Sequence, residues 1–302
     1  MTLFELIEDG AHRLDTAGVV FGHGTTCAFD EAAWLTLWRL GLPLDTSLDA
    51  PEDDPNSKRN MPVTLSQQGF VASLIEERIA TRKPAAYLTR EAWLQGVPFY
   101  VDERAIVPRS LIAEVLAEGS IDIWLSDTTH DVLDLCTGNG SLAVLAALAW
   151  PEVQVVGADL SADALAVARL NVERHQLAER ITLVQSDGLQ ALESQRFDLV
   201  LCNPPYVNAQ SMAELPPEFR AEPDMALSGN ACGGHDGMDF VRQLLADLPR
   251  HLSEQGVLVL EIGHERAHFE AAFPQLNPVW LETSAGGDQV LLLTREALLT
   301  TA

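Results

Sequence analysis

The sequence predicts an α/β fold in which a mostly parallel sheet follows a small N-terminal helical domain. Residues 1 to about 80 carry apolar side chains at helical spacing, whereas the chain from Val132 onward alternates short apolar runs with helix-like runs. The last two apolar runs form an apparent strand hairpin, which indicates one antiparallel strand in the sheet. A chain of 302 residues with 47% hydrophobic content can form one sizeable core and a smaller unit.

The N-terminal elements follow from apolar spacing and from helix-ending residues. One helix is expected around residues 3–7, and a second runs from an acidic first turn at Asp30 until Gly41 ends it. Residues 49–60 are polar and rich in proline and aspartate, which predicts an exposed loop. A further helix over residues 65–81 would close a small bundle.

The second half begins with a predicted β-hairpin. Two short alternating runs, Ala92–Leu94 and Pro98–Val101, flank Gln95 and Gly96, and a helix is expected over residues 111–117. Strand-like apolar runs then recur along the chain. They are Val132–Leu135, Gln154–Asp159, Ile181–Asp187, Phe197–Cys202, Gly256–Ile262, Pro278–Leu281 and Gln289–Leu293.

The most informative motif is Asn203-Pro204-Pro205-Tyr206, directly after a strand-like run. A planar NH2 group is a poor nucleophile because its nitrogen lone pair is delocalised, so it must be held beside a methyl donor. The Asn203 side-chain carbonyl and the Pro204 backbone carbonyl would accept its two hydrogens, while the prolines restrict φ and Tyr206 packs on the planar group. This combination predicts the amide site of an S-adenosylmethionine-dependent methyltransferase; a Pro-rich turn alone would not explain the flanking residues.

A second motif predicts where the cofactor lies. The strand-like run from Val132 leads into Cys136, Thr137, Gly138, Asn139 and Gly140, and then into a helix-like run over 141–150. The glycines permit a tight turn and close approach of a ligand, and amides near a helix N-terminus favour a carboxylate.

Two carboxylates end the next strand-like runs. Asp159 lies about twenty residues downstream of the turn, where ribose hydroxyls are bound in nucleotide folds; capping of the following helix is the alternative. Asp187 would lie near the adenine, and a turn-forming aspartate before Gly188 explains it equally well.

Charge and cysteine content limit the class of protein. The net charge is −25, from 44 acidic and 19 basic residues, which opposes nucleic-acid binding and suits a basic protein partner or simple solubility. No long apolar run or signal peptide is present, so we expect a soluble cytosolic protein. The cysteines lack paired metal spacing, which predicts reduced thiols and no metal site. They are Cys27, Cys136, Cys202 and Cys232.

Three features of the sequence have more than one interpretation. Arg109 precedes a predicted helix and could contact a ligand, an acid of the catalytic loop or a helix-start partner. Trp34 and Trp38 share a helix face, which suits core packing or a partner-binding surface. Residues 207–235 form a predicted loop long enough to be functional, and we expect it to shape the substrate entrance.

These residues together resemble the N5-glutamine methyltransferases that modify protein glutamines during translation, and the resemblance covers nearly the whole chain. It implies a helical substrate-recognition domain over residues 1–82, a hairpin linker over 83–106, and a Rossmann-like seven-stranded methyltransferase domain over 107–302. Pro-Arg-Ser at 108–110 and Gly-His-Gly-Thr at 22–25 resemble the branch acting on the third protein of the large ribosomal subunit, rather than the release-factor branch.

The resemblance also implies roles for single positions. It places the cofactor against residues 136–140, Asp159 on the ribose, and Asn203 beside the donor sulfonium. Gly188 stands where some relatives carry an aromatic residue that stacks on adenine, and Phe99 would reach the cofactor from the hairpin. The partner implied is a basic ribosomal protein.

Two other functions fit parts of the pattern. Adenine-N6 methyltransferases of DNA or RNA use the same tetrapeptide, but they need a basic surface, and this chain has only Lys58 and Lys83 as lysines. A non-catalytic module that binds ribosome-assembly intermediates would not need an intact tetrapeptide and cofactor turn. The sequence therefore favours a protein-glutamine methyltransferase that does not act on DNA.

Overall fold

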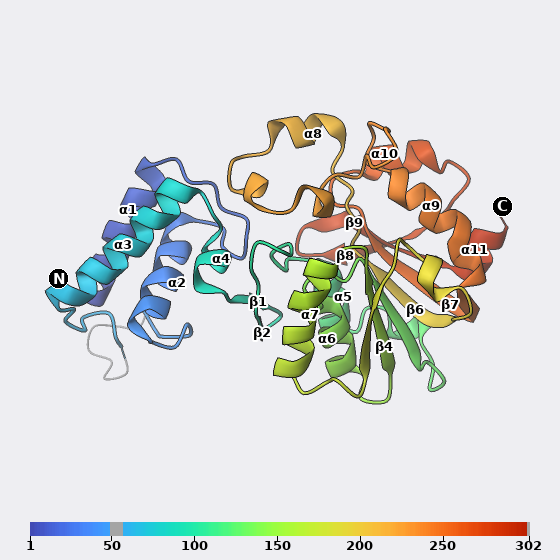
Figure 1. The fold of residues 1–302 in the computed structure, drawn as a ribbon, viewed down its shortest axis with the longest axis horizontal. Helices are drawn as coiled ribbons and strands as arrows, with labels where there is room; N and C mark the ends of the chain where they lie inside the picture. Colours follow the sequence, from blue (N-terminus) through green and yellow to red (C-terminus); the bar gives the residue numbers. More distant parts are fainter. Residues whose placement is uncertain (49–56, 301–302) are drawn as a thin grey trace. The chain divides into compact units, whose positions relative to one another are not determined.

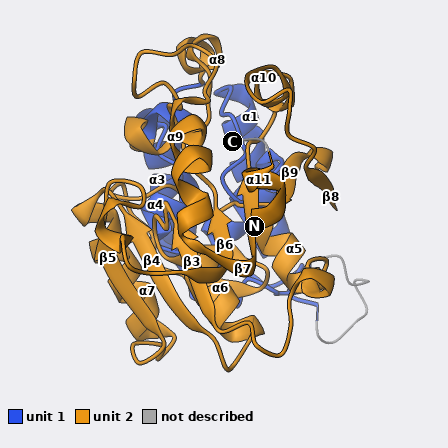
Figure 2. Cartoon of the chain, turned by 90° about the vertical axis from the view of Figure 1, so that its right-hand side faces the viewer, with its two compact units in different colours: residues 1–91, 216–221 blue, residues 92–215, 222–302 orange. Residues whose placement is uncertain are grey.

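The computed structural model describes residues 1–48 and 57–300, so the first eight residues of the predicted loop at 49–60 lie outside the described part. The chain divides into two compact units (Figures 1 and 2). The helical unit comprises Met1–Glu91 and Pro216–Ala221, and the sheet unit comprises Ala92–Leu215 and Glu222–Ala302. The structure thus places the division after Glu91 and assigns a short segment of the predicted entrance loop to the helical unit.

The helical unit forms because capped amphipathic helices share one apolar core. Capping boxes at Thr2 and Thr64 begin the first and third helices, and Gly41 ends the second in a left-handed conformation. Trp34 and Trp38 pack against this core, which agrees with the core-packing interpretation of the two tryptophans. The helices are α1 (Leu3–Thr16), α2 (Ala28–Leu40), α3 (Leu65–Thr81) and α4 (Ala85–Thr89).

The sheet unit begins with the predicted hairpin and continues into a seven-stranded sheet of order β5-β4-β3-β6-β7-β9-β8. Only β9 runs antiparallel to its neighbours, as the sequence predicted. The strands are β1 (Ala92–Leu94), β2 (Val97–Phe99), β3 (Asp131–Leu135), β4 (Gln154–Asp159), β5 (Ile181–Gln185), β6 (Phe197–Cys202), β7 (Leu252–Glu261), β8 (Val279–Thr283) and β9 (Gly286–Thr294).

Helices cover both faces of the sheet because its central strands are apolar on both sides. On β6, Leu199 and Leu201 face one core and Val200 and Cys202 face the other. Helices α5 (Ile112–Glu118), α6 (Ser141–Ala149) and α7 (Ala162–Arg174) cover the first face, and α9 (Asp239–Asp247), α10 (Arg266–Ala272) and α11 (Arg295–Leu299) cover the second.

Some elements differ from the sequence prediction. The segment 207–235 is not a plain loop, since it contains the helix α8 (Ala209–Glu214) and short helical turns at Phe219–Ala221 and Asp224–Ala226. Strand β7 starts at Leu252, earlier than the predicted Gly256. Other short turns lie at Asp122–Trp124, Gln190–Leu192 and Leu248–Arg250. No helix in the described ranges is long and apolar enough to cross a membrane.

Candidate active site

The predicted site residues meet at the carboxyl edge of three neighbouring strands. Parallel pairing aligns Leu135 of β3 with Ala158 of β4 and with Cys202 of β6. The residues at the ends of these strands are therefore neighbours at one edge. They are the turn 136–140 after β3, Asp159 as the last residue of β4, and the tetrapeptide 203–206 after β6. Open parallel sheets bind ligands at this edge.

The turn 136–140 has an unusual backbone that its sequence permits. Cys136 has a positive φ of 61°, and Gly140, with φ of 80°, begins α6. A Cβ at Gly140 would lie 3.1 Å from the Cβ of Ala168 on α7, so glycine here allows α7 to pack closely. Asn171 of α7 donates to the Asn139 carbonyl at 2.8 Å and thereby fixes the turn from behind.

Nearby side chains accept hydrogen bonds from two backbone N–H groups in the first turn of the helix that follows. The Asn139 side chain accepts from Ser141 N at 3.2 Å, and Asp134 accepts from Ala143 N at 2.9 Å and from the Thr137 hydroxyl. The sequence predicted exposed amides here, whereas these two amides are bonded within the protein. The turn is therefore held in place by hydrogen bonds within the protein.

Asp159 supports the same turn. Its carboxylate accepts from Gly138 N at 2.9 Å and from Ser161 N at 2.8 Å. The Leu160 backbone N–H also faces this carboxylate. Because a carboxylate has about four acceptor sites, acceptor capacity remains for a ligand hydroxyl group. Burial raises the pKa of Asp159, although these backbone donors oppose the rise. The predicted ribose role and the capping role are thus compatible in one side chain.

Asn203 and Pro204 present acceptors that the protein does not use. Among the described residues, no hydrogen bond occupies the Asn203 side-chain amide or the Pro204 carbonyl. Asn203 is half-buried and Pro204 is buried, so both acceptors lie close to the protein rather than in open solvent. This is the arrangement expected of a site that grips the two hydrogens of a planar NH2 group.

Tyr206 is held by the core beneath the site. Its ring lies close to Gly263, where a Cβ would come within 2.5 Å of the ring, and its hydroxyl donates to Glu261 at 3.4 Å. Burial and the neighbouring Glu261 raise the pKa of Tyr206, so it stays protonated. Glu261 also accepts from the Ser110 hydroxyl at 2.5 Å, which ties the tetrapeptide to the start of α5.

Arg109 pairs with an acid at the end of the segment that follows the tetrapeptide. Its two terminal nitrogens donate to the two oxygens of Glu222, each at 2.7 Å, and Glu222 also accepts from Val107 N at 2.9 Å. Such a fork-like pair fixes orientation as well as distance. Neither Glu222 nor Glu261 could be predicted as a partner from the sequence, because their contacts join residues that are between 55 and 151 positions apart.

The remaining predicted residues lie less centrally. Asp187 is exposed at the end of β5 and accepts from the Gln190 side chain at 3.3 Å, and Gly188 follows it with a positive φ of 55°. Phe99 is fully buried in the first core and packs on His175 with ring centroids 5.4 Å apart. The structure therefore does not bring Phe99 to the edge where the other residues meet.

A family model and several known proteins match this chain in sequence. A family model described as the methyltransferase small domain matches residues 114–222, which include the turn and the tetrapeptide. The ribosomal protein uL3 glutamine methyltransferase of Bordetella pertussis is 52% identical to the chain, covering 99% of this chain and 97% of that protein. The chain belongs to the ribosomal protein uL3 glutamine methyltransferase family. This confirms the predicted family and its ribosomal-protein branch.

Other members are more distant in sequence and also match over most of their length. The uL3 glutamine methyltransferase of Neisseria meningitidis serogroup B is 44% identical over 99% of this chain and 94% of that protein. That of Bradyrhizobium diazoefficiens is 42% identical over 96% and 89%. Among solved structures, the catalytic domain of hMettl16 in complex with MAT2A 3'UTR hairpin 1 aligns with a TM-score of 0.50 at 14% identity, covering 76% of this chain and 80% of that chain. That likeness concerns the fold alone.

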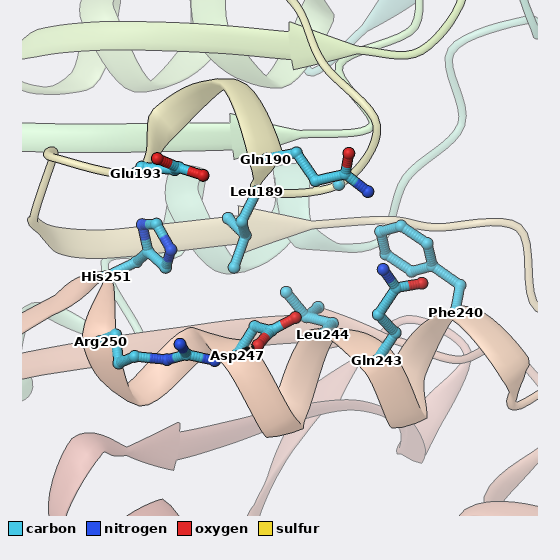
Figure 3. A pocket seen from close by; sticks show the side chains of 10 residues that line it. Leu189, Gln190, Glu193, Phe240, Gln243, Leu244, Asp247, Arg250 and His251 are labelled. Carbon is cyan, nitrogen blue, oxygen red and sulfur yellow. Dashed lines mark hydrogen bonds and ion pairs between the residues drawn. The ribbon is translucent and has the colours of Figure 1, made fainter.

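In this family member, an aromatic residue that the sequence analysis missed lies beside Gly188. A Cβ placed on Gly188 would lie 4.0 Å from Cε2 of Phe240, which is on α9. A pocket extends from these two residues along α9 past Leu189, Gln243 and His251 (Figure 3). Phe240 thus supplies an aromatic ring from a different element at the position where the sequence has only glycine.

In Asp134→Asn, the free energy of unfolding is expected to fall less than in the wild type as the pH rises. Burial raises the pKa of Asp134 to about 7, from an ordinary value of 3.8. Below the ordinary value the carboxyl is protonated in both folded and unfolded chains. As pH rises from about 4 to 7 the unfolded chain loses its proton first, so the stability that this group contributes is lost across that window. Asparagine does not titrate and removes this loss.

The check is the free energy of unfolding in urea, measured between about pH 4 and pH 8 for both proteins. Over this pH range the free energy of unfolding should fall more in the wild type than in Asp134→Asn, and the difference should be on the order of a few kcal/mol. Asp187→Asn is the control, since Asp187 is exposed and its replacement should leave the pH profile as in the wild type. Identical profiles for wild type and Asp134→Asn would contradict the assignment.

Proposed function

We propose that the protein transfers a methyl group from S-adenosylmethionine to the side-chain nitrogen of a glutamine in ribosomal protein uL3. The observation that carries the proposal is the pair of unused acceptors, the Asn203 side-chain carbonyl and the Pro204 carbonyl, beside the turn 136–140. A primary amide has two N–H hydrogens to match that pair. The names of the relatives supply the protein substrate, and the charge of −25 favours a basic partner.

The residues at the strand edge fit the parts of S-adenosylmethionine. The turn 136–140 would hold its amino-acid end, Asp159 the ribose hydroxyls, and Asp187 and Phe240 the adenine. When bound, the cofactor supplies an electrophilic methyl group on a sulfonium. The fit rests on the spare acceptor capacity of Asp159 and on the aromatic face next to Gly188.

The chain's own residues would act mainly by positioning. Asn203 and Pro204 would accept the two amide hydrogens and keep the nitrogen in line with the methyl carbon. The cofactor would supply the methyl group and keep the electron pair of the broken carbon–sulfur bond on its sulfur, so Asn203 and Pro204 would face a nitrogen on which positive charge develops. The two acceptors stabilise that charge better than the neutral amide, and the surplus proton then leaves to water, so no strong base is required.

An acceptor panel tests this proposal. The purified protein would be incubated with labelled S-adenosylmethionine and, separately, with recombinant uL3, a release factor, or duplex DNA containing adenine. Label on uL3 alone is the expected result. Label only on the release factor would keep the chemistry and change the substrate, and label only on DNA would overturn the substrate class.

Phe240→Ala is expected to weaken S-adenosylmethionine binding by about tenfold, because stacking of a base on an aromatic ring contributes roughly 1–3 kcal/mol. Calorimetric titration measures this directly, without activity. Phe240→Trp should retain the affinity, since it keeps a stacking face. Phe70→Ala is the control, because Phe70 is a half-exposed ring in the helical unit. Unchanged affinity in Phe240→Ala would remove Phe240 from the adenine site.

A further inference from the structure

The segment Pro216–Ala221 belongs to the helical unit, although the residues on both sides of it belong to the sheet unit. It lies in the stretch that follows the tetrapeptide, between α8 and Glu222. After the tetrapeptide and α8, the six residues 216–221 thus belong to the helical unit, and the next residue, Glu222, is again part of the sheet unit and pairs with Arg109. No feature of the proposed methyl transfer explains this excursion.

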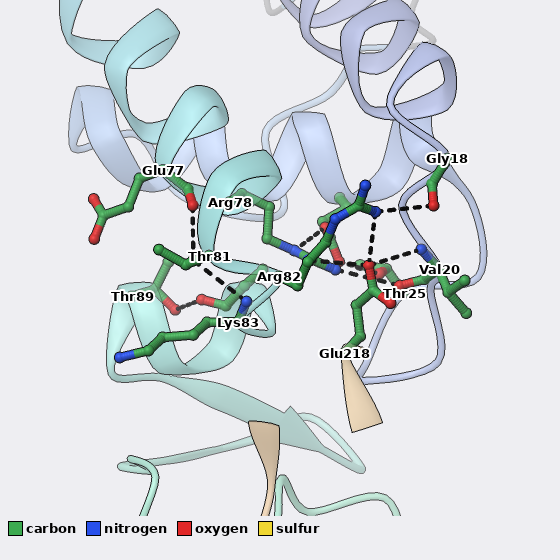
Figure 4. Close-up of polar contacts among 12 residues, drawn as sticks. Gly18, Val20, Thr25, Glu77, Arg78, Thr81, Arg82, Lys83, Thr89 and Glu218 are labelled. Carbon is green, nitrogen blue, oxygen red and sulfur yellow. Dashed lines mark hydrogen bonds and ion pairs between the residues drawn. The ribbon is translucent and has the colours of Figure 1, made fainter. Parts of the chain in front are cut away.

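Glu218 is the centre of the segment and is fully buried. One of its oxygens accepts from Val20 N and from Nη1 of Arg82, each at 3.2 Å, and lies 3.8 Å from Nη1 of Arg78 (Figure 4). The Glu218 side chain has no exposed surface, and neither has Arg78. We call the residues around Glu218, namely Val20, Arg78 and Arg82, the Glu218 socket.

Charge explains why the socket holds a carboxylate. Arg78 donates from Nε to the buried Glu31 at 2.8 Å, and Arg82 donates to the carbonyls of Ala17 at 2.6 Å and Gly18 at 2.9 Å. The guanidinium groups of Arg78 and Arg82 thus both face Glu218, Arg78 being shared with Glu31, and a guanidinium cannot lose its charge in a protein. Glu218 supplies the second negative charge that makes the group neutral.

The neighbouring Phe219 adds a close-packed ring contact to these charge contacts. Its ring lies 4.3 Å, centroid to centroid, from that of His23, and its Cζ would be 3.1 Å from a Cβ at Gly22. Gly22 also has a positive φ of 135°, so both the backbone and the contact require glycine. The run Gly22-His23-Gly24-Thr25, which the proposed chemistry leaves without a role, therefore receives the segment 216–221.

We infer that Glu218 is a positioning residue: by fixing the middle of the segment 207–235, here called the substrate loop, within the helical unit, it keeps the chain that follows the tetrapeptide ordered for a protein substrate. The inference rests on the proposed function for its substrate, but the anchor itself does not. Both ends of the loop are also fixed, by Asn208 donating to Glu265 at 2.7 Å and by Glu222 accepting from Arg109. Between these ends, Glu218 supplies hydrogen bonds and charge contacts to the helical unit, and Phe219 adds a ring contact with His23.

The test compares Glu218→Ala and Glu218→Gln with the wild type in three measurements. Hydrogen exchange at the Val20 amide should become about tenfold faster in Glu218→Ala, because this amide donates directly to Glu218. With uL3 as acceptor, kcat should fall by about tenfold in Glu218→Ala and less in Glu218→Gln, the size expected for one hydrogen bond to a charged group. S-adenosylmethionine affinity, measured by calorimetry, should stay unchanged in both.

Glu214→Gln is the matched control, since Glu214 lies in the same loop but is exposed, and its carboxylate accepts a hydrogen bond from Gln210 on the same helix. It should leave all three measurements unchanged. If Glu218→Ala does not fold, Phe219→Leu, which loosens the same segment without uncovering a charge, should accelerate exchange at Val20 and lower kcat. Unchanged exchange at Val20 in the folded variants would overturn the anchor, and accelerated exchange with unchanged kcat would overturn its positioning role.

The two proposals fail in different ways. If the wild type labels none of the three acceptors, the proposed function fails, while the exchange measurement still decides whether Glu218 holds the loop. If the wild type labels uL3 and the Glu218 variants match it, the proposed function stands and the positioning role fails. If the wild type labels a release factor instead, the kinetic comparison uses that acceptor.

Discussion

Replacing Asn203 by alanine is expected to lower the rate of methyl transfer by about 100-fold to 1,000-fold, the size found when one preorganised polar group is removed from a transition-state site. The Pro204 carbonyl remains, but one amide hydrogen loses its acceptor, so the nitrogen is neither aligned nor stabilised as it becomes positive. Cofactor binding should be retained in part, because the turn 136–140 and Asp159 are untouched. Single-turnover rates at saturating S-adenosylmethionine provide the measurement.

Gln210→Ala is the control for Asn203→Ala. Gln210 is an exposed amide side chain on α8, a few residues after the tetrapeptide, and its loss should not change the single-turnover rate. Asn203→Ala turning over at the wild-type rate would reject the role of Asn203. If Asn203→Ala instead lost cofactor binding entirely, Asn203 would be assigned to the cofactor site rather than to the amide site.

Asp159→Asn is expected to raise the dissociation constant of S-adenosylmethionine by about tenfold to 100-fold, since a hydrogen bond to a charged group contributes roughly 1.5–3 kcal/mol. Two causes act together. The amide keeps one acceptor oxygen in place of two, so it cannot serve Gly138, Ser161 and a ribose at once. The turn 136–140 also loses its fixed position.

Calorimetric titration at constant pH measures the affinity of Asp159→Asn, and Asp163→Asn is its control. Asp163 is an exposed acid in the first turn of the same helix, so its replacement changes the charge by the same amount without touching the turn. Equal affinity in the wild type and Asp159→Asn would leave Asp159 with a capping role alone.

The sheet could be predicted because its strands carry their own signal. Runs such as Phe197–Cys202 are apolar throughout, which is typical of strands buried on both faces, and the turn glycines and the acid at 159 mark where they end. The tetrapeptide was readable for a similar reason, since its chemistry is contained in four consecutive residues. Short elements such as α4 and α8 were not predicted, because a helix of one or two turns shows too little periodicity.

The contacts that fix the site could not be predicted in the same way. The pairs Arg109 with Glu222 and Tyr206 with Glu261 join distant parts of the chain, and nothing local in an acidic residue marks its partner. Glu218 is the strongest case. The chain has 44 acidic residues, and an exposed position is the ordinary expectation for any of them, so its burial between two arginines becomes visible only in the fold.

The most direct test of the central claim is to map the methyl group on uL3 after incubation with the purified enzyme and S-adenosylmethionine. Peptide fragmentation by mass spectrometry would identify both the modified residue and the atom that carries the methyl group. A single glutamine methylated on its side-chain nitrogen, and formed about 100-fold or more slowly with Asn203→Ala, is the result that the arrangement of Asn203 and Pro204 predicts. Methylation of a lysine, an arginine or a chain terminus, or the same methylation formed by Asn203→Ala at the wild-type rate, would contradict it.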